Sequence, residues 1–254
     1  MGQTTQTAGS AGLQTGTAAA GREPHGASGV VERLKAKHQA IWDPAQRFNS
    51  HTNGGLALRT HRAIRWFERA VREHDFGDTD VAFILYWIAF NSVYGKDLNE
   101  NGTESDSFGE FLGALIELDE RNDIHHAIHD RFKETVEQIL EDRYLYDGFW
   151  QHANGRFGYA DWRARLEQRN AHARGFLQEG KTESFLSTVF GRLYTLRNQL
   201  VHGGATQNSA LNRDSVRDGA SVMGFLVPIF LQIMLSHPEA TWGPPWYPPR
   251  LSEQ

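Results

Sequence analysis

The chain contains no cysteine, which excludes disulfides, thiolate zinc sites and a cysteine nucleophile. No stretch approaches the 18 consecutive apolar residues of a membrane span, because Gly224, Pro228 and Gln232 interrupt the longest candidate, residues 222–235. We therefore expect no membrane association. The formal net charge of −5 argues against broad binding to a polyphosphate, which depends on many Lys and Arg contacts. Any nucleic acid would have to meet a local basic surface.

Three regions differ in composition. Residues 1–27 form a Gly, Ala, Thr and Gln-rich leader without the basic start or apolar core of a signal peptide, and we predict that it is disordered in a cytoplasmic protein. Residues 28–237 hold most of the apolar residues, which make up 39% of the chain, and are predicted to fold as one domain. Residues 238–254 are rich in Pro and Trp, so we expect an extended tail whose aromatic side chains pack on the body.

The hydrophobic periodicity predicts an all-α fold, a bundle of about seven to eight helices that ends in an antiparallel helix hairpin. Asp78 or Thr79 is predicted to cap the third helix, which is apolar nearly all round and should be central, with Asn91 as its polar exception. Ser28 is predicted to cap the first helix. Residues 99–107 and 146–158 are predicted as a loop and a turn-rich connection. The expected helices are 30–42, 56–74, 80–94, 108–118, 124–144, 161–177, 184–202 and 211–235.

The penultimate helix carries three polar residues in one short stretch. At about 100° per residue, Asn198 and His202 fall together, with Arg197 on the flank, roughly opposite an apolar stripe of Val189, Leu193, Leu196 and Leu200. These three polar residues are therefore not core filling. An ordinary helix end, with His202 near the last carbonyls and Gly203 in the left-handed conformation, explains the same spacing without any catalytic role.

Two segments resemble HEPN domains, a family of helical nucleases and nucleotide-binding modules common in bacterial defence and toxin systems. They are Leu-Arg-Asn-Gln-Leu-Val-His-Gly-Gly-Ala-Thr, residues 196–206, and Trp-Ile-Ala-Phe-Asn-Ser-Val-Tyr-Gly, residues 87–95. The first contains the Arg-x4-His pattern of the family as Arg197, Asn198 and His202. The resemblance covers roughly residues 78–235 and is weakest in the middle helices.

The resemblance implies a homodimer in which two copies of the motif face each other across a cleft and cut RNA without a metal or other cofactor. His202 would exchange a proton with the ribose 2′-hydroxyl or the leaving 5′-oxygen, Arg197 would hold the scissile phosphate, and Asn198 would orient phosphate or His202. A 2′,3′-cyclic phosphate end would result. The protein would be a toxin or defence effector, with an antitoxin or neighbouring defence protein as partner. The alternative is a catalytically silent module that binds RNA, nucleotide or a protein.

Three further residues are RNA-binding candidates. Asn91 could project toward the motif, as polar groups on this helix do in the family, or it could be a core residue bonded to backbone. Arg213 and Arg217, one turn apart at the start of the last helix, could line the cleft or pair with Asp214 and Asp218.

Other patterns carry weaker hypotheses. His125 and His129 have a spacing able to hold zinc, but no third ligand is recognisable, so we predict no metal site. The arginines from Arg59 to Arg72 could dock RNA, or they could form a solvated face balanced by Glu68 and Glu73. The segment Arg169-Asn170 followed by His172 has the composition of the motif with the wrong spacing, and we set it aside.

Overall fold

The structure is a computed structural model that describes residues 27–42, 53–95, 104–210, 212–245 and 247. The predicted leader lies outside these residues except for its last position. The described part is helical and contains no strand, which confirms the all-α prediction, although its ten α-helices exceed the seven to eight expected. They are α1 Ala27–Ile41, α2 Asn53–Asp75, α3 Thr79–Tyr94, α4 Glu104–Glu117, α5 Asp123–His126, α6 Lys133–Glu141, α7 Asp147–Ala153, α8 Trp162–Gln178, α9 Thr182–Val201 and α10 Arg213–Ser236.

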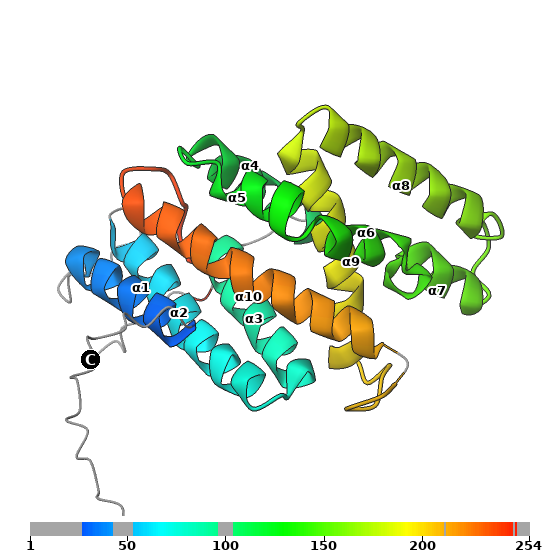
Figure 1. The fold of residues 1–254 in the computed structure, drawn as a ribbon, viewed down its shortest axis with the longest axis horizontal. Coiled ribbons are helices and arrows are strands. Elements are labelled where there is room, and N and C mark those ends of the chain that lie inside the picture. The colour runs from blue at the N-terminus through cyan, green and yellow to red at the C-terminus, as the bar shows by residue number, and fades with distance from the viewer. Residues whose placement is uncertain (1–26, 43–52, 96–103, 211, 246, 248–254) are drawn as a thin grey trace, which may run out of the picture.

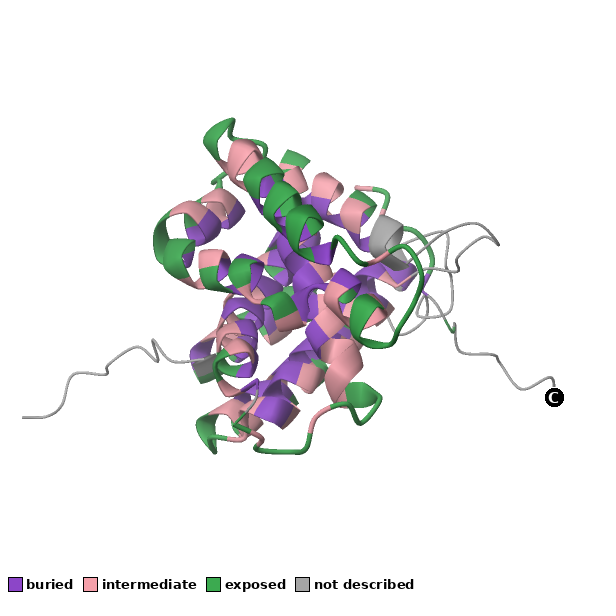
Figure 2. Cartoon of the chain, turned by 90° about the vertical axis from the view of Figure 1, so that its right-hand side faces the viewer, coloured by how far each residue is buried: buried purple, intermediate pink, exposed green. Residues whose placement is uncertain are grey.

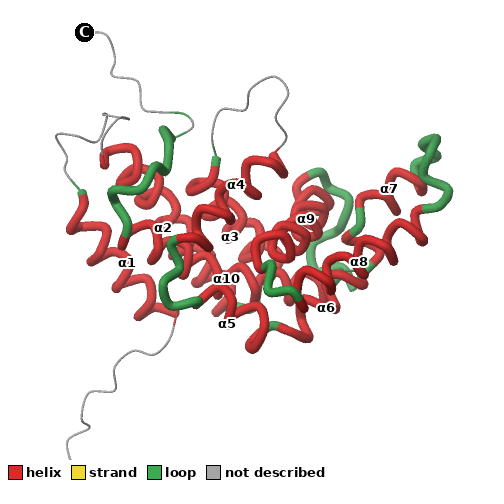
Figure 3. Tube along the Cα trace, turned by 90° about the horizontal axis from the view of Figure 1, so that it is seen from above, coloured by secondary structure: helices red, strands yellow, loops and turns green. Residues whose placement is uncertain are grey.

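The helices form two groups that share one hydrophobic core. Helices α1, α2, α3 and α10 pack on one another, α9 stands between this group and α7 and α8, and α6 contacts both α9 and α10 (Figures 1 and 3). The buried residues lie on the inward-facing sides of the helices, and the outer helix faces are exposed (Figure 2). A smaller apolar cluster of Tyr146, Trp162 and Leu166 joins α7 to α8. Burial at both places excludes apolar side chains from water, which is the main stabilising contribution.

Helix α3 is the central helix that its composition predicts. Its side chains are buried on several faces, and the Phe90 ring lies 4.6 Å from that of Phe190 on α9 and 6.0 Å from that of Phe230 on α10. Asp78 caps the helix as predicted, because its Oδ1 accepts a hydrogen bond from the Val81 N–H at 3.1 Å. The aromatic contacts join three helices that are distant in sequence.

The basic face of α2 is largely neutralised by its own helix. Glu68 pairs with Arg65 and Arg72, and Glu73 pairs with Arg69. This arrangement favours the solvated, charge-balanced face over the RNA-docking surface. Arg59 is instead buried.

Arg59 connects the C-terminal tail to the core. Its guanidinium donates to the carbonyls of Val93, at the end of α3, and of Pro244. The Trp242 ring lies 6.2 Å from that of Phe111 on α4, so this aromatic side chain of the tail packs on the body as expected. Trp246 lies outside the described residues.

Several predicted boundaries were wrong. The helix expected over 124–144 is divided into α5, a π-helical turn Ala127–Arg131, α6 and a 3-10 turn Arg143–Leu145. The break is marked by a backbone hydrogen bond from the Phe132 N–H to the Ala127 carbonyl, five residues earlier, and the Phe132 ring beside it is buried. The turn-rich region 146–158 contains α7, α4 begins at Glu104 within the expected loop, and Ser28 lies inside α1 and is not its cap.

The last two helices were predicted to pair as an antiparallel hairpin, but α10 packs mainly on α3 and α2 and only slightly on α9. Gly219 of α10 permits this close approach, since a Cβ there would lie 2.9 Å from Cε2 of Phe83. By length and composition alone, α10 could cross a membrane, and it is the one such helix in the described part of the chain. In this fold, however, most of that helix is buried against its neighbours.

Candidate functional site

The end of α9 determines where the predicted motif lies. Gly203 has φ +71°, its N–H donates to the Leu200 carbonyl, and the Gly204 N–H donates to the Gln199 carbonyl at 2.7 Å. This pair of bonds is a Schellman motif, which ends a helix at a left-handed glycine. The local sequence therefore places His202 as the C-cap residue of α9, where it is exposed to solvent.

Two of the three motif side chains are in contact. Arg197 Nη1 donates to Asn198 Oδ1 at 2.8 Å, and its guanidinium lies 6.0 Å from the centre of the Tyr194 ring. Both residues are half-buried. His202 makes no side-chain hydrogen bond to any described residue. Its imidazole is therefore accessible to a molecule that approaches from solvent, and an imidazole is a group that can exchange a proton with such a molecule.

Of the three tentative RNA-binding residues, Arg213 is connected through Asp80 to the loop that follows the motif, whereas Asn91 lies away from it. Arg213 pairs with Asp80 of α3 at 2.9 Å, whereas Arg217 pairs with Asp214, which is the alternative that the sequence left open for it. Asn91 is half-buried, and its Oδ1 is enclosed without a hydrogen-bond partner in the described structure. It lies eleven residues beyond Asp80 on α3, about 16 Å along the helix axis. Because Asp80 is bonded to the loop after α9, Asn91 is remote from the motif.

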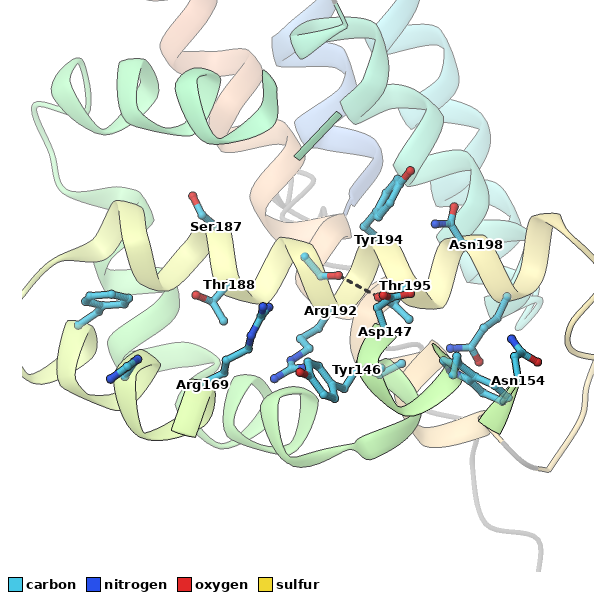
Figure 4. A pocket seen from close by; sticks show the side chains of 16 residues that line it. Tyr146, Asp147, Asn154, Arg169, Ser187, Thr188, Arg192, Tyr194, Thr195 and Asn198 are labelled. Atoms are coloured by element: carbon cyan, nitrogen blue, oxygen red, sulfur yellow. Dashed lines mark hydrogen bonds between the residues drawn. The ribbon is translucent and has the colours of Figure 1, made fainter. Parts of the chain in front are cut away.

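A cleft of about 710 Å³ runs along α9 toward the motif (Figure 4). Its other walls are the segment from Leu145 through α7 to Asn154 and one face of α8. The α9 side chains that line it recur three and four residues apart, from Ser187 to Asn198 and Gln199. His202 is not a lining residue, but it follows Asn198 by four positions and so continues the same helix face. The exposed imidazole therefore follows the last residues of α9 that line the cleft.

The cleft holds two arginines from facing helices. Arg192 of α9 and Arg169 of α8 both lie over the ring of Tyr146, with guanidinium carbons 4.8 Å and 5.7 Å from its centre. Arg192 Nη2 donates to Asn170 Oδ1 at 2.9 Å, and Asn170 Nδ2 donates to the Leu140 carbonyl at 2.9 Å. The amide of Asn170 is thereby oriented so that its oxygen faces Arg192. Burial lowers the pKa of Arg192 to about 10, so it remains a cation at neutral pH.

Sequence reasoning missed this cleft. Arg192 lies among the buried apolar residues of α9, and nothing in the helical periodicity distinguishes it from a misplaced charge. The segment containing Arg169, Asn170 and His172 has the composition of the motif but not its spacing. In the structure, Arg169 and His172 line the cleft, and the side chain of Asn170 accepts a hydrogen bond from Arg192. The contact between α8 and α9 brings these residues together.

The histidine cluster of the metal hypothesis has a different arrangement. The rings of His125 and His129 stack at 3.8 Å, and His125 Nδ1 is 3.1 Å from Thr182 Oγ1. His126 pairs with Asp130. Within the described ranges, no three His, Asp or Glu side chains converge as metal ligands would.

Comparison with models of known families, with curated proteins and with solved structures finds no match to this chain.

Proposed function

We propose that this chain is an endoribonuclease of the HEPN type that cleaves RNA without a metal ion. The observation that supports the proposal is the end of α9, where Arg197 is held by Asn198 beside an exposed His202. The cleft that leads to this end adds two cations in a protein whose net charge is negative. RNA can approach such a local basic surface despite the overall charge.

The proposed reaction uses residue types suited to phosphodiester cleavage. The ribose 2′-oxygen forms a bond to phosphorus, the bond from phosphorus to the 5′-oxygen breaks, and a 2′,3′-cyclic phosphate remains. One proton leaves the 2′-hydroxyl and one is given to the 5′-oxygen, and imidazole can do either near neutrality. Arg197 presents a planar pair of N–H donors to the phosphate oxygens, whose negative charge grows in the transition state.

A homodimer completes this proposal, because two copies of His202 supply one proton acceptor and one proton donor. Val201 is 48% exposed beside His202, and Phe76 is 85% exposed at the turn between α2 and α3. The hydrogen bond from Gln207 to Asp78 places that turn and the loop after α9 at the same end of the molecule. Exposed apolar side chains gathered beside a site favour a protein contact there. The cytoplasmic location and an inhibitory partner protein belong to the same proposal.

The second candidate is a module that binds RNA without cutting it. It is favoured by one observation, namely that Arg197 and Asn198 are hydrogen-bonded to each other, whereas the side chain of His202 forms no hydrogen bond with either in the described residues. The two candidates share the RNA ligand and differ in whether the bound strand is cut.

A cleavage assay separates them. Purified protein should cut a single-stranded RNA in EDTA, leave 2′,3′-cyclic phosphate ends, and spare the same oligomer with a 2′-deoxyribose at the cleavage position. His202→Ala should reduce the rate on the order of 10²-fold or more. Arg197→Ala should also reduce it while the protein remains folded.

His126→Ala is the matched control. His126 is an exposed helical histidine near the other end of α9, because its neighbour His125 contacts Thr182. Its replacement should leave the rate unchanged. Full activity of the His202 variant would contradict the proposed role of that residue, and binding without cleavage by the wild type would favour the second candidate.

A further inference from the structure

The buried cation in the cleft forms no direct ion pair with a described carboxylate. Arg192 is only 4% exposed, and no carboxylate of the described residues forms a salt bridge with it. Its Nη2 is bonded to the neutral amide of Asn170, and its Nε is enclosed without a partner. Burial of an unpaired charge is costly, so buried arginines are normally paired with an anion. This arrangement points to an anion that is not part of the chain.

A second cation beside Arg192 strengthens this argument. Arg169 approaches the same Tyr146 ring, and its charge contributes to the lowered pKa of Arg192, after burial as the main cause. Two like charges are therefore held near each other with no salt bridge from either to a described carboxylate. The charge of Asp142 opposes the lowering of the Arg192 pKa without a salt bridge between the two, and this carboxylate accepts hydrogen bonds from the Tyr144 N–H and from Ser215. The exposed Asp147 accepts from Gln151.

The rest of the cleft suits an extended ligand with aromatic groups. Trp150 is half-buried in its wall, and its Nε1 donates to the Tyr144 carbonyl at 2.8 Å, which fixes the position of the indole. Asn198 lies farther along α9 in the direction of the motif, with its side chain on the other side of the helix from Arg192 (Figure 4). Arg192 and His202 are ten positions apart in the sequence, which corresponds to about 15 Å along the axis of α9. This distance is longer than a single phosphate group. A ligand that contacts both ends must therefore be a chain.

We propose that the cleft is a substrate-positioning subsite for single-stranded RNA, in which Arg192 and Arg169 hold a phosphodiester on the same strand as the scissile one, and a base lies against Trp150. Paired guanidinium groups recognise phosphate oxygens through parallel N–H donors. A basic groove with aromatic side chains is the usual surface for single-stranded nucleic acid. The choice of RNA as the ligand rests on the proposed function, whereas the anion site itself rests on Arg192 and Arg169.

The test measures binding separately from cleavage. The full chain carrying His202→Ala is titrated with a fluorescein-labelled single-stranded RNA octamer, and the affinity is compared after adding Arg169→Gln. Arg169 is exposed, so its replacement should leave the fold intact. We expect the Kd to rise on the order of 10-fold, since a charged hydrogen bond is lost. The slope of log affinity against log salt should become shallower by about 0.7.

Arg163→Gln is the matched control, because Arg163 is an exposed arginine on the same helix that does not line the cleft. It removes the same charge from α8 and should leave the Kd nearly unchanged. Equal weakening by both variants would show a general charge effect and overturn the subsite. An unchanged Kd in the Arg169 variant would overturn it as well.

Two further comparisons distinguish a free nucleotide from an RNA strand as the ligand, and the subsite from the proposed nuclease activity. If uridine monophosphate binds as tightly as the octamer, with the same dependence on Arg169, the site takes free nucleotides and the RNA subsite is overturned. Cleavage by the wild type together with an Arg169-independent Kd would remove the subsite alone. Binding that depends on Arg169, in a wild type that cuts no RNA, would support the subsite and contradict the proposed nuclease. Failure of every variant to bind RNA would contradict both.

Discussion

Arg213, at the start of α10, forms an ion pair with Asp80, at the start of α3, with 2.9 Å between Nη2 and Oδ2. The same Asp80 oxygen accepts a hydrogen bond at 2.7 Å from the backbone N–H of Asn208, in the loop that follows the motif. A single buried carboxylate thus connects two helix starts and holds the loop beside His202 in place. Arg213 is engaged in this network, whereas Arg192 forms no salt bridge with a carboxylate of the described residues.

Removal of the guanidinium of Arg213 should therefore destabilise the protein. Arg213→Gln leaves Asp80 buried without its cation, and we expect a loss of about 2–3 kcal/mol in the free energy of unfolding, measured by urea denaturation. Arg217→Gln is the control, because its pair with Asp214 is exposed and should contribute less than about 1 kcal/mol. Equal losses in the two variants would contradict the anchoring role of Asp80.

The close packing of α10 on α3 makes a second prediction. Gly219→Ala would place a methyl group 2.9 Å from the Phe83 ring and 3.2 Å from Leu193 Cδ2, so we expect a loss of about 1–3 kcal/mol in stability. Gly175→Ala, in α8, meets no atom within 4 Å and should stabilise by about 0.5–1 kcal/mol through helix propensity. The two changes should shift the denaturation midpoint in opposite directions. A stabilised Gly219 variant would show that the helices separate easily there.

The proposed dimer can be tested at its exposed apolar side chains. Val201→Glu introduces a charge beside His202, and the desolvation of that charge in a contact between two copies should convert a dimer into a monomer. Phe157→Glu is the control, since Phe157 is fully exposed in the connection between α7 and α8. Light scattering at micromolar concentration gives the mass of each variant. A monomeric wild type, or a dimeric Val201 variant, would count against the contact.

Acid should weaken the fold through His38. Burial is the main reason that the pKa of His38 is lowered, opposed by its hydrogen bond to the Ala57 carbonyl and assisted by the charge of His61. The unfolded chain, with an ordinary pKa of about 6.5, then binds protons that the folded state does not. The stability is complete above about pH 6.5 and falls as the pH decreases below that value.

Urea denaturation between pH 7.5 and pH 5 measures this loss. His38→Gln removes the titrating group and should reduce the pH dependence, even if the variant is less stable at every pH. The exposed His172, replaced in the same way, should leave the dependence unchanged. An unaltered pH profile in the His38 variant would rule out that residue as a source of acid sensitivity.

Particular residues show how far the sequence could be interpreted. Asp78 as the cap of α3 and Gly203 as the end of α9 were both predictable, because each depends on a few neighbouring backbone groups. The π-helical turn was not, since it follows from where the Phe132 ring is buried. Arg213 was expected to pair with Asp214 or to contact RNA, and it pairs with a residue 133 positions away.

The candidate site also contains a part that the local sequence predicts and a part that only the packing of the helices brings together. The exposure of His202 follows from its place before a left-handed glycine, and the neighbouring positions of Arg197 and Asn198 follow from the helix. The basic cleft could not be found in this way, because Arg192 looks like an isolated charge on an apolar face until α8 brings Asn170 and Arg169 to it.

The amino-acid sequence alone determined the helical character of the chain, the buried position of α3 and the end of α9, because helix periodicity and capping act over a few residues. The tertiary structure decided which charged side chains form ion pairs, as Arg213 does with Asp80, and which, such as Arg192, do not. Those outcomes depend on the packing of α8 against α9 and of α10 against α3, where side chains far apart in the chain share one buried, weakly screened environment.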